Sequence, residues 1–506
     1  MPKKRMKDKY DIIIVGAGIG GLGAATYLAQ EGYSVLVLEK HYRVGGYAHS
    51  FRRNKYIFDS AVRIVAGAEG DGLLHDLLRK AGLDDTLPFI KLDEVYTAVY
   101  PEHQFTVHAG VQSFIDSYST MFPHERQNIE NLIKEMEDLY DATIHMLHAE
   151  SPLAALSNPL VMKYRSLTFH EMLESFIDDP KLQFMLAALW GYYGASPTAG
   201  SAMYFSYAIM SYFKEGIYYL EGSFQTLADS FVKRIEACGG DVFINSEVTK
   251  IEVEDKAVKG VFLKKGHYIE APVIISNGDM LKMIHSLVGV EKFSSRYRKK
   301  VDSLTLSMSA FEVFIGTDLP LEDMGLSHET FVYTDYDYDH IFQSHSDLKK
   351  LGIKGLKGLA ISCPSLVDPS LSPEGKHTII ITTLVPYDIG GDWKSLKPEY
   401  EKALITLAEK AIPGLSEHID FVESGTPLTM ERYTNNSFGA IYGWEQTKKQ
   451  MTTRPQHETP IKGLYLSGHW TDPGGGVVSV LLSSYKLFEK LMSKETALKK
   501  EEVVWK

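Results

Sequence analysis

Asp11-Ile-Ile-Ile-Val-Gly16-Ala-Gly18-Ile-Gly20-Gly21-Leu-Gly23 is the stretch that decides the fold. An aliphatic run enters a G-x-G-x-x-G turn, an amphipathic segment follows, and a second aliphatic run, 35–38, ends at Glu39. This order predicts a strand, a tight turn, a helix and a second strand, which together form the βαβ unit of a dinucleotide-binding domain. A glycine turn that binds nothing does not account for the acid at the end of the second strand.

Each glycine of this turn has a physical task. Gly16 permits the tight turn, Gly18 lets the backbone approach a pyrophosphate, and Gly21 lets the helix pack closely on the strand. The unpaired N–H groups at the start of the helix attract phosphate charge. Glu39 lies 18 residues after Gly21, where it is placed to accept hydrogen bonds from an adenosine ribose. We therefore expect a dinucleotide site that includes Gly16, Gly18, Gly20, Gly21, Glu39 and Lys40.

A second glycine turn, His41-Tyr-Arg43-Val-Gly45-Gly46, follows directly and indicates which dinucleotide binds. The R-x-G-G pattern suits another close approach of the backbone to the cofactor, with Arg43 available to a phosphate or carbonyl oxygen. In nicotinamide dehydrogenases the chain normally runs straight into the next βα unit. Flavoproteins with this double-glycine extension bind FAD in an extended form. We therefore expect FAD, with Arg43, Gly45 and Gly46 among its contacts.

Length and composition restrict the class of protein. At 506 residues the chain is too long for one ordinary core, so two domains are expected. The net charge of −12 argues against a nucleic-acid partner. The two cysteines, Cys238 and Cys363, argue against a disulfide scaffold or a cysteine-ligated metal site and fit a reducing compartment. We find no signal peptide and no uninterrupted apolar run of about 18 residues, so we expect a cytoplasmic protein without a spanning helix.

The remaining chain alternates between helix-rich and strand-rich stretches. Apolar spacing predicts helices over 125–148, 182–193 and 201–213, short half-buried strands between 242 and 276, longer strands between 304 and 384, and a helix over 399–411. We predict an α/β fold with a Rossmann-like FAD-binding domain built from discontinuous segments, 1–95, 221–285 and 431–506. The second, substrate-binding domain, 96–220 and 286–430, is predicted to be an antiparallel sheet with a helical, aromatic-rich cap.

The C-terminal segment provides a second element for the cofactor. A strand leads through Gly468 into the turn Gly474-Gly-Gly476, and a helix begins near Val477. A helix N-terminus directed at a flavin ring stabilises the negative charge that develops there during reduction. We expect Gly468, Gly475, Gly476, Val477 and Val478 to contact FAD.

Taken together, these motifs resemble the phytoene desaturase family of FAD oxidoreductases, which includes carotenoid isomerases and retinol saturases. The resemblance runs nearly the whole length. Beyond the two glycine turns it rests on Tyr219-Leu-Glu-Gly222, Ala271-Pro-Val-Ile-Ile-Ser-Asn277, Ser437-Phe-Gly-Ala-Ile-Tyr-Gly-Trp444, Leu464-Tyr-Leu-Ser-Gly468 and Pro473-Gly-Gly-Gly-Val477. It implies an FAD domain broken by insertions and a contact between the backbone of Val248 and adenine. Many relatives carry an Asp after the glycine that matches Gly468, whereas this chain has His469-Trp470.

The resemblance also implies a substrate: an elongated polyene or isoprenoid lipid, carotenoid- or retinoid-like, whose carbon–carbon bonds are desaturated, saturated or isomerised. An aromatic-rich band in the predicted cap suits stacking on such a molecule. Its members are Trp190, Tyr192, Tyr193, Tyr204, Phe205, Tyr207, Tyr212, Phe213, Tyr218 and Tyr219. We expect a protein that takes its substrate from a bilayer through peripheral contact.

The catalytic chemistry is expected to belong to the flavin, because no Ser/His/Asp order and no spacing typical of metal ligands is present. His49 is our candidate for a flavin-side group, and Glu445 for an acid or base. No second nucleotide fingerprint appears, so we expect a quinone, oxygen or a redox protein as the electron partner rather than a tightly bound NADPH.

Two other functions are compatible with the fold. A flavin amine oxidase predicts a lysine near the flavin and an aromatic cage, neither of which the sequence identifies. A non-catalytic escort protein for prenylated lipids, from the same superfamily, has lost flavin, and the intact fingerprint with Glu39 argues against that reading.

Overall fold

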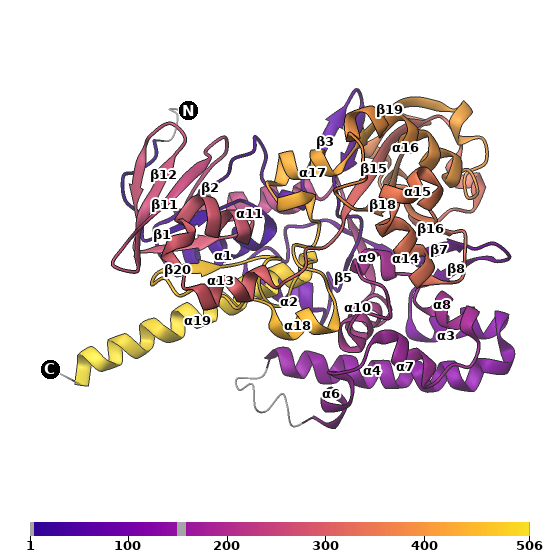
Figure 1. Ribbon diagram of the computed structural model, residues 1–506, viewed down its shortest axis with the longest axis horizontal. Coiled ribbons are helices and arrows are strands. Elements are labelled where there is room, and N and C mark those ends of the chain that lie inside the picture. Colours follow the sequence, from indigo (N-terminus) through magenta and orange to yellow (C-terminus); the bar gives the residue numbers. More distant parts are fainter. Residues whose placement is uncertain (1–4, 149–157, 505–506) are drawn as a thin grey trace.

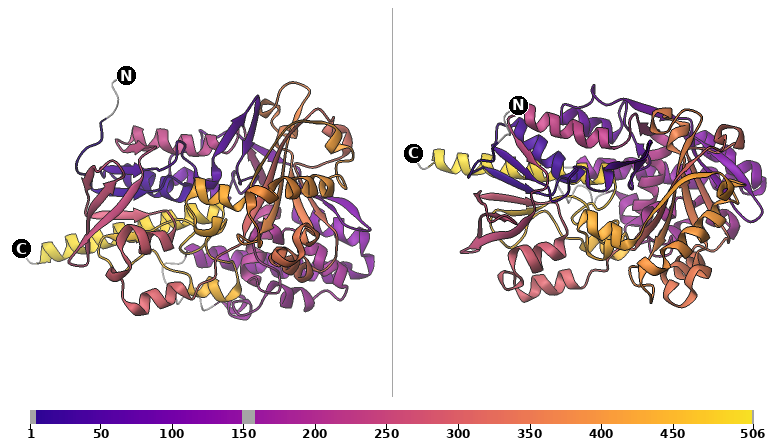
Figure 2. Two further views of the ribbon diagram at one scale, coloured as in Figure 1. Left: turned by 45° about the horizontal axis from the view of Figure 1, so that its top comes forward. Right: turned by 90° about the horizontal axis from the view of Figure 1, so that it is seen from above.

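The structure is a computed structural model, and it describes residues 5–148 and 158–504. Figure 1 shows two lobes. The first lobe, on the left, contains the elements of the glycine fingerprint, and the second contains a larger sheet at the upper right above a group of helices. The last helix of the chain projects away from the first lobe, as all views agree (Figures 1 and 2).

Five parallel strands form the centre of the first lobe, in the order β10-β2-β1-β14-β20. They are β10 (Asp241–Phe243), β2 (Val35–Leu38), β1 (Ile12–Val15), β14 (Val273–Ser276) and β20 (Leu464–Leu466). They come from widely separated parts of the chain, which confirms the prediction of a Rossmann-like domain built from discontinuous segments.

Both faces of this parallel sheet are buried. Because successive side chains of a strand point to opposite faces, Ile12 and Ile14 pack in one core cluster and Ile13 in another. The first cluster contains side chains of helices α1 (Ile19–Gln30), α11 (Gln225–Ala237) and α19 (Val477–Val504). The second contains the meander β11 (Val248–Glu254), β12 (Ala257–Leu263) and β13 (Tyr268–Glu270). This three-layer arrangement explains why the strands of the fingerprint are aliphatic throughout.

The chain beyond the meander also packs on the first lobe. Helices α12 (Met280–Lys282), η3 (Met283–Val288), η4 (Val290–Lys292) and α13 (Ser295–Asp302) follow β14. Val288, Phe293 and Val301 are buried in the same cluster as the meander. Residues on both sides of position 285, up to Val301, therefore share a core with the meander.

The second lobe contains a seven-stranded sheet in the order β19-β15-β18-β17-β16-β7-β8. The strands are β7 (Glu94–Val99), β8 (Gln104–His108), β15 (Ser309–Thr317), β16 (Glu329–Tyr333), β17 (Gly358–Ser362), β18 (His377–Val385) and β19 (Ile419–Gly425). All neighbours are antiparallel except β16 and β7, which run parallel. The prediction of an antiparallel sheet is therefore correct except for this one pair. Strands β7 and β16 come from distant parts of the chain.

One face of this sheet is covered by α15 (Leu348–Leu351) and α16 (Trp393–Ala408), whose buried side chains share a core cluster with Val313 and Ile381. Helix α14 (Tyr338–Ser346) packs on the side of the cap, because its Tyr338 and Ile341 belong to the cluster that contains Phe331 and Leu384. Helix α16 begins at Trp393, earlier than the predicted start at Glu399. The reason is a cap that precedes the proline: the Asp392 carboxylate accepts a hydrogen bond from the Ser395 N–H at 3.2 Å, and Pro398 then lies inside the helix.

The remaining helices form the predicted cap at the lower right of Figure 1. They are α3 (Val111–Met121), α4 (Arg126–His148), α6 (Pro159–Tyr164), α7 (Phe169–Glu174), α8 (Pro180–Leu186), α9 (Trp190–Tyr193) and α10 (Ala202–Lys214). Helix α10 packs against α3, α4 and α7. The other elements are α2 (Leu73–Lys80), α17 (Pro427–Thr434), α18 (Lys448–Thr453), the hairpin of β3 (Ser50–Arg53) with β4 (Tyr56–Asp59), and the small sheet β5 (Val65–Ala66), β9 (Ile217–Leu220) and β6 (Phe89–Leu92).

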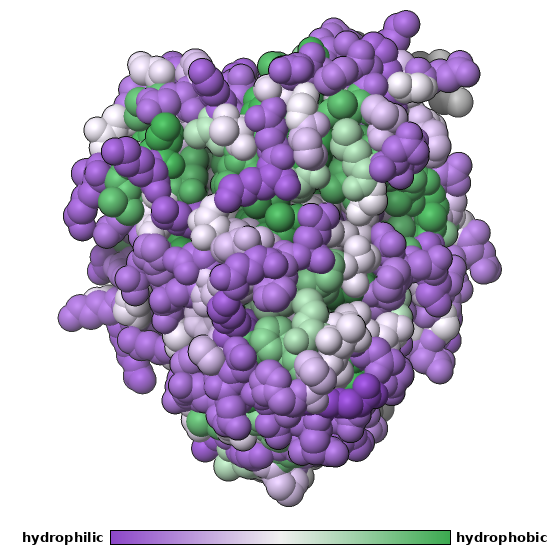
Figure 3. All heavy atoms as spheres, turned by 90° about the vertical axis from the view of Figure 1, so that its right-hand side faces the viewer, coloured by the Kyte–Doolittle hydropathy of each residue, from purple (hydrophilic) through white to green (hydrophobic). Residues whose placement is uncertain are grey.

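The surface is mainly polar. Figure 3 shows the outer face of the second lobe, where hydrophobic side chains appear in separate groups between hydrophilic ones. In residues 5–148 and 158–504, no helix combines the length and the apolar character needed to cross a membrane.

Candidate functional site: a cavity between the two lobes

A cavity of about 590 Å³ lies where the two lobes meet. All but one of the cofactor contacts predicted from the sequence line it: Gly16, Gly18, Gly20, Glu39, Lys40, Arg43, Gly45, Gly46, Val248, Gly468, Gly475, Gly476, Val477 and Val478. Gly21 does not line the cavity, in keeping with its predicted role in packing. Four segments that are distant in the sequence therefore meet around one space.

The fingerprint turn leaves no room for side chains. Gly16 has a φ of +100°, which favours glycine. A Cβ on Gly21 would lie 2.2 Å from the Gly16 carbonyl oxygen, and one on Gly18 would lie 2.9 Å from Nδ2 of Asn277. Helix α1 begins at Ile19, and no side chain caps it. The Gly21 N–H donates to the Gly18 carbonyl at 2.9 Å, which leaves the N–H groups of Ile19 and Gly20 for an anion beside Gly18.

Glu39 is held at the end of β2 by the backbone. Its Oε2 accepts a hydrogen bond from the Ala17 N–H at 2.7 Å, and its Oε1 accepts one from the His41 N–H, also at 2.7 Å. Burial raises the pKa of Glu39, and these backbone hydrogen bonds counteract part of the rise. The carboxylate is therefore fixed in orientation at the cavity wall, as recognition of a ribose diol requires.

The second glycine turn touches the first. The Gly45 N–H donates to the Ala17 carbonyl at 2.8 Å, and Gly45 and Gly46 have φ values of +113° and +59°. A Cβ on Gly46 would lie 3.1 Å from Cα of Gly18. The guanidinium of Arg43 donates to the Ser50 carbonyl at 2.7 Å, so Arg43 braces this turn and still lines the cavity.

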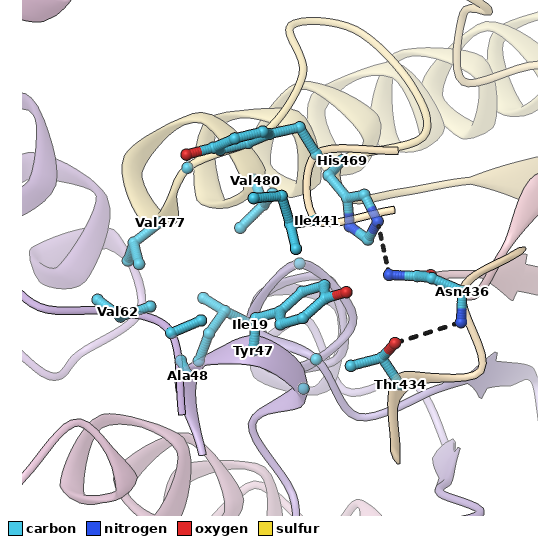
Figure 4. A pocket seen from close by; sticks show the side chains of 18 of the residues that line it. Ile19, Tyr47, Ala48, Val62, Thr434, Asn436, Ile441, His469, Val477 and Val480 are labelled. Carbon is cyan, nitrogen blue, oxygen red and sulfur yellow. Dashed lines mark hydrogen bonds between the residues drawn. The ribbon is translucent and has the colours of Figure 1, made fainter. Parts of the chain in front are cut away.

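The third turn brings a second helix N-terminus to the cavity. Gly468, Gly474 and Gly476 have φ values of +88°, +122° and +107°. A Cβ on Gly20 would lie 2.8 Å from Cα of Gly468, so this turn packs directly on the start of α1. Helix α19 begins at Val477, and its first turn lines the cavity. Figure 4 shows Val477 and Val480 on one side of the space, opposite Ile19 and Ala48.

His469, at the position where the family resemblance implies an Asp, is held by an amide that the sequence did not single out. The indole N–H of Trp470 donates to Oδ1 of Asn436 at 3.1 Å. Because an indole only donates, this contact orients the Asn436 amide so that its Nδ2 donates to Nε2 of His469 at 3.3 Å. Burial lowers the pKa of His469 to about 3. His469 is therefore neutral with its proton on Nδ1, and it lines the cavity (Figure 4).

The two catalytic candidates lie in different places. His49 lines the cavity, and its Nδ1 lies 2.7 Å from the Gly46 carbonyl and 3.1 Å from Oγ of Ser60. Burial lowers the pKa of His49 to about 4, so the ring is neutral. Glu445 does not line the cavity, although burial raises the pKa of its carboxyl.

A buried ion pair forms part of the wall on the side of the second lobe. Nη2 of Arg63 lies 2.7 Å from Oε1 of Glu312, and the two side chains are 4% and 3% exposed. Glu312 lies on β15, opposite Thr382 of β18, and all three residues line the cavity. Oε2 of Glu312 is buried without a hydrogen-bond partner among the described residues, and burial raises the pKa of this carboxyl to about 7.

A stripe of side chains along α10 lines the same cavity as the glycine turns. Residues three and four positions apart share one face of a helix, and the stripe consists of Tyr204, Tyr207, Ala208, Ser211, Tyr212 and, just after the helix end, Glu215. At 1.5 Å per residue its length is about 16 Å. We call this stripe, together with Tyr192, Tyr193 and Tyr442 from neighbouring segments, the tyrosine slot.

Half of the predicted aromatic band lines this slot, namely Tyr192, Tyr193, Tyr204, Tyr207 and Tyr212. The other five, Trp190, Phe205, Phe213, Tyr218 and Tyr219, are buried in the core. Lys282 also lines the cavity, 3.4 Å from Glu431 and 3.3 Å from Asn435. Among the described residues no group of three or more His, Cys, Asp or Glu side chains is arranged to hold a metal ion.

Comparison with known proteins identifies the class of site. The sequence model of the family of flavin containing amine oxidoreductases matches residues 19–486. All-trans-retinol 13,14-reductase of Danio rerio is 25% identical over 92% of this chain and 83% of its own length. Prolycopene isomerase of Daucus carota is 27% identical (94% and 78%), and phytoene desaturase of Rhodobacter capsulatus is 27% identical (93% and 91%).

The fold has solved counterparts as well. A putrescine oxidase structure superposes with a TM-score of 0.67 at 16% identity, covering 96% of this chain and 99% of the other. The cavity fits FAD on its own features: two helix N-termini, a fixed carboxylate for the ribose, and glycines at Gly18 and Gly46 where side chains would fill the space. The residues that bind FAD would be those of the three glycine turns with Glu39.

Proposed function

The chain belongs to the family of flavin containing amine oxidoreductases, and from that premise we propose that it acts on carbon–carbon bonds of a polyene or isoprenoid lipid. The reaction is desaturation, saturation or cis–trans isomerisation. The chain is an FAD-dependent oxidoreductase, and bound FAD supplies two-electron hydride transfer. The relatives named above that act on retinol, prolycopene and phytoene support the choice of substrate class.

The observation that carries the proposal is the continuity of the tyrosine slot with the three glycine turns. The same cavity is lined by Gly45 and Val477 at the cofactor side and by Tyr207 and Tyr212 along α10. Aromatic faces pack against a flat conjugated chain and exclude water from it, which prevents loss of a hydride to solvent. A slot about 16 Å long suits an extended chain better than a compact substrate.

The protein's own groups have distinct tasks in this proposal. The start of α1 would hold the pyrophosphate, Glu39 the adenosine ribose, and the backbone of Val248 the adenine. The N–H groups of Val477 and Val478 lie at the positive end of α19, where they would stabilise negative charge on a bound flavin. His49, being neutral, provides a hydrogen bond at the cofactor rather than a charge. We propose a quinone, oxygen or a redox protein as the electron partner, and peripheral contact with a membrane as the source of substrate.

The alternative within the family is oxidation of amines, as the name putrescine oxidase indicates for that protein. It predicts a lysine near the flavin and an aromatic cage. Lys282 lines the cavity within hydrogen-bond distance of Glu431 and Asn435, and tyrosines line it as well. Amine oxidation is therefore the alternative that the substrate panel must test.

The test is a panel of substrates incubated with the purified flavoprotein under oxidising and reducing conditions. Carotenoids, retinoids and other isoprenoid lipids are analysed by mass spectrometry for gain or loss of two hydrogens, and by chromatography for isomers. Polyamines and monoamines are assayed in parallel for aldehyde formation. Turnover of amines with no change in any polyene would refute the proposal.

A further inference from the structure

The tyrosine slot ends in a carboxyl group that neither the FAD site nor the hydride transfer requires. Glu215 follows the last residue of α10 and is the acidic member of the stripe that begins at Tyr204. Every other member of the stripe is a tyrosine, an alanine or a serine. An apolar hydrocarbon gains nothing from a carboxyl at this position, because burial of a polar group without a partner costs free energy.

One oxygen of this carboxyl is anchored by the protein, and the other is not. Oε1 accepts hydrogen bonds from the Tyr140 hydroxyl and from the Leu73 N–H, the latter at 3.4 Å. Tyr140 is in turn stacked on Tyr207 of the slot, with ring centroids 5.7 Å apart and planes 7° from parallel. Among the described residues no hydrogen bond reaches Oε2. The carboxyl is thus oriented through Oε1, and its Oε2 has no partner among the described residues although Glu215 lines the cavity.

Within residues 5–148 and 158–504, no Lys, Arg or His forms an ion pair with Glu215. Its neighbour Lys214 is paired with Asp141 at 2.7 Å. Burial raises the pKa of Glu215, which favours the neutral form. A carboxyl accepts a hydrogen bond in either protonation state, and an alcohol both donates and accepts, so a hydroxyl group fits Oε2 in both states. Gly67 leaves room for this group, because a Cβ there would lie 2.2 Å from Oε2.

We propose that Glu215 is a recognition subsite for a terminal hydroxyl group, so that the preferred ligand is an elongated polyene or isoprenoid alcohol rather than a hydrocarbon. The hydroxyl exchanges a hydrogen bond with Oε2, while the chain lies along the tyrosines of α10. This inference rests on the proposed function for the class of lipid that binds. It adds that the protein recognises the hydroxyl end of that lipid.

The experiment measures binding without turnover. Oxidised holoenzyme, with no electron donor, is titrated with all-trans-retinol and with the matching hydrocarbon that lacks the hydroxyl, and binding is followed by quenching of tryptophan fluorescence. Wild-type protein is expected to bind the alcohol about 10-fold more tightly, the effect of one hydrogen bond in a partly dry site. In Glu215→Leu the two ligands should bind alike.

Two further variants separate recognition from folding. Glu215→Gln keeps shape and hydrogen bonding, so part of the preference for the alcohol should survive. In Gly67→Ala, the added methyl group displaces the Glu215 carboxyl. The preference for the alcohol over the hydrocarbon should therefore fall although Glu215 itself is unchanged. Glu374→Leu, an exposed site far along the chain, serves as the control and should leave the ratio unchanged. FAD content is measured for each variant.

The outcomes distinguish this inference from the proposed function. Equal binding of both ligands to the wild type, a preference that persists in Glu215→Leu, or tighter binding of the matching amine would overturn the hydroxyl subsite while leaving lipid oxidoreduction intact. A Glu215-dependent preference for the alcohol without any turnover would support the subsite and refute the proposed reaction. Failure of both ligands to bind would refute both.

Discussion

Replacing Glu312 by Gln should remove a pH dependence of stability that originates in the cavity wall. The carboxyl of Glu312 is buried against Arg63, and burial raises its pKa from 4.5 to about 7. Glutamine has the same shape and can keep the contact between Oε1 and the guanidinium, which is 2.7 Å in the wild type. The variant therefore changes the titration while disturbing the packing little.

The direction follows from the protons bound in each state. Below about pH 4.5 the carboxyl is protonated in both folded and unfolded chains and has no effect on the pH slope. Between 4.5 and about 7 the folded protein retains a proton that the unfolded chain has released, so wild-type stability falls as pH rises. At about 1.36 kcal/mol per pH unit, the loss across this window is about 3 kcal/mol.

The measurement is the free energy of unfolding from urea titrations of both proteins between pH 5 and pH 8, followed by circular dichroism and flavin fluorescence. The difference between Glu312→Gln and wild type should move in favour of the variant by about 2.5 kcal/mol as the pH rises from 5 to 8. The exposed Glu374→Gln, which changes the net charge equally, should show no such trend. A difference that stays constant across this range would refute the link between burial and titration.

Four other outcomes are expected. Gly18→Val should abolish flavin absorbance, because a Cβ at this position already lies 2.9 Å from Nδ2 of Asn277; full absorbance would contradict the assignment of the fingerprint. In Gly475→Val, the new Cβ would lie 2.8 Å from the Tyr442 ring and should shift the N-terminus of α19. The flavin midpoint potential should then fall by on the order of tens of millivolts. An unchanged potential with FAD bound would mean that this turn only closes the fold. His49→Ala should lower the rate without altering the shape of the pH profile between pH 5 and pH 8, since the pKa of His49 is lowered to about 4; the loss of a pH step in that range would show a charged role. The protein should sediment partly with liposomes and be released by salt or mild detergent, and turnover of lipid with no sedimentation at all would exclude entry from the bilayer.

The cofactor turns could be predicted because their information is local. In Gly16 to Gly21 and in Arg43 to Gly46, the residues that the backbone conformation requires lie within a few positions of those predicted to contact the ligand. Both turns can therefore be recognised from the sequence alone. The periodicity of α10 also held information: Tyr204, Tyr207 and Tyr212 share the cavity face, whereas Phe205 and Phe213 do not. Helical spacing would have separated the two sets.

Other features depend on tertiary structure. Arg63 and Glu312 are 249 residues apart, and nothing near either residue indicates its partner. The parallel pairing of β16 with β7 is equally hidden, because apolar patterns do not record strand direction. Asn436 belongs to the same class: its importance follows from the Trp470 N–H and His469, which lie more than thirty positions away. The sequence signal at this site was His469 itself, which stands where the family resemblance implies an Asp.

The order of strands in the first lobe has a consequence for biosynthesis. The central strand β1 is made first, while β20 and helix α19, which complete the same cofactor cavity, are made last. At about 5–20 residues per second, the nascent fingerprint waits on the order of half a minute or more for its partners. From the time β14 is made, its aliphatic edge stays open until β20 arrives, and FAD has only part of its site. A chain truncated shortly before β20 should therefore fail to retain FAD, because the edge of the sheet and the start of α19 are both missing.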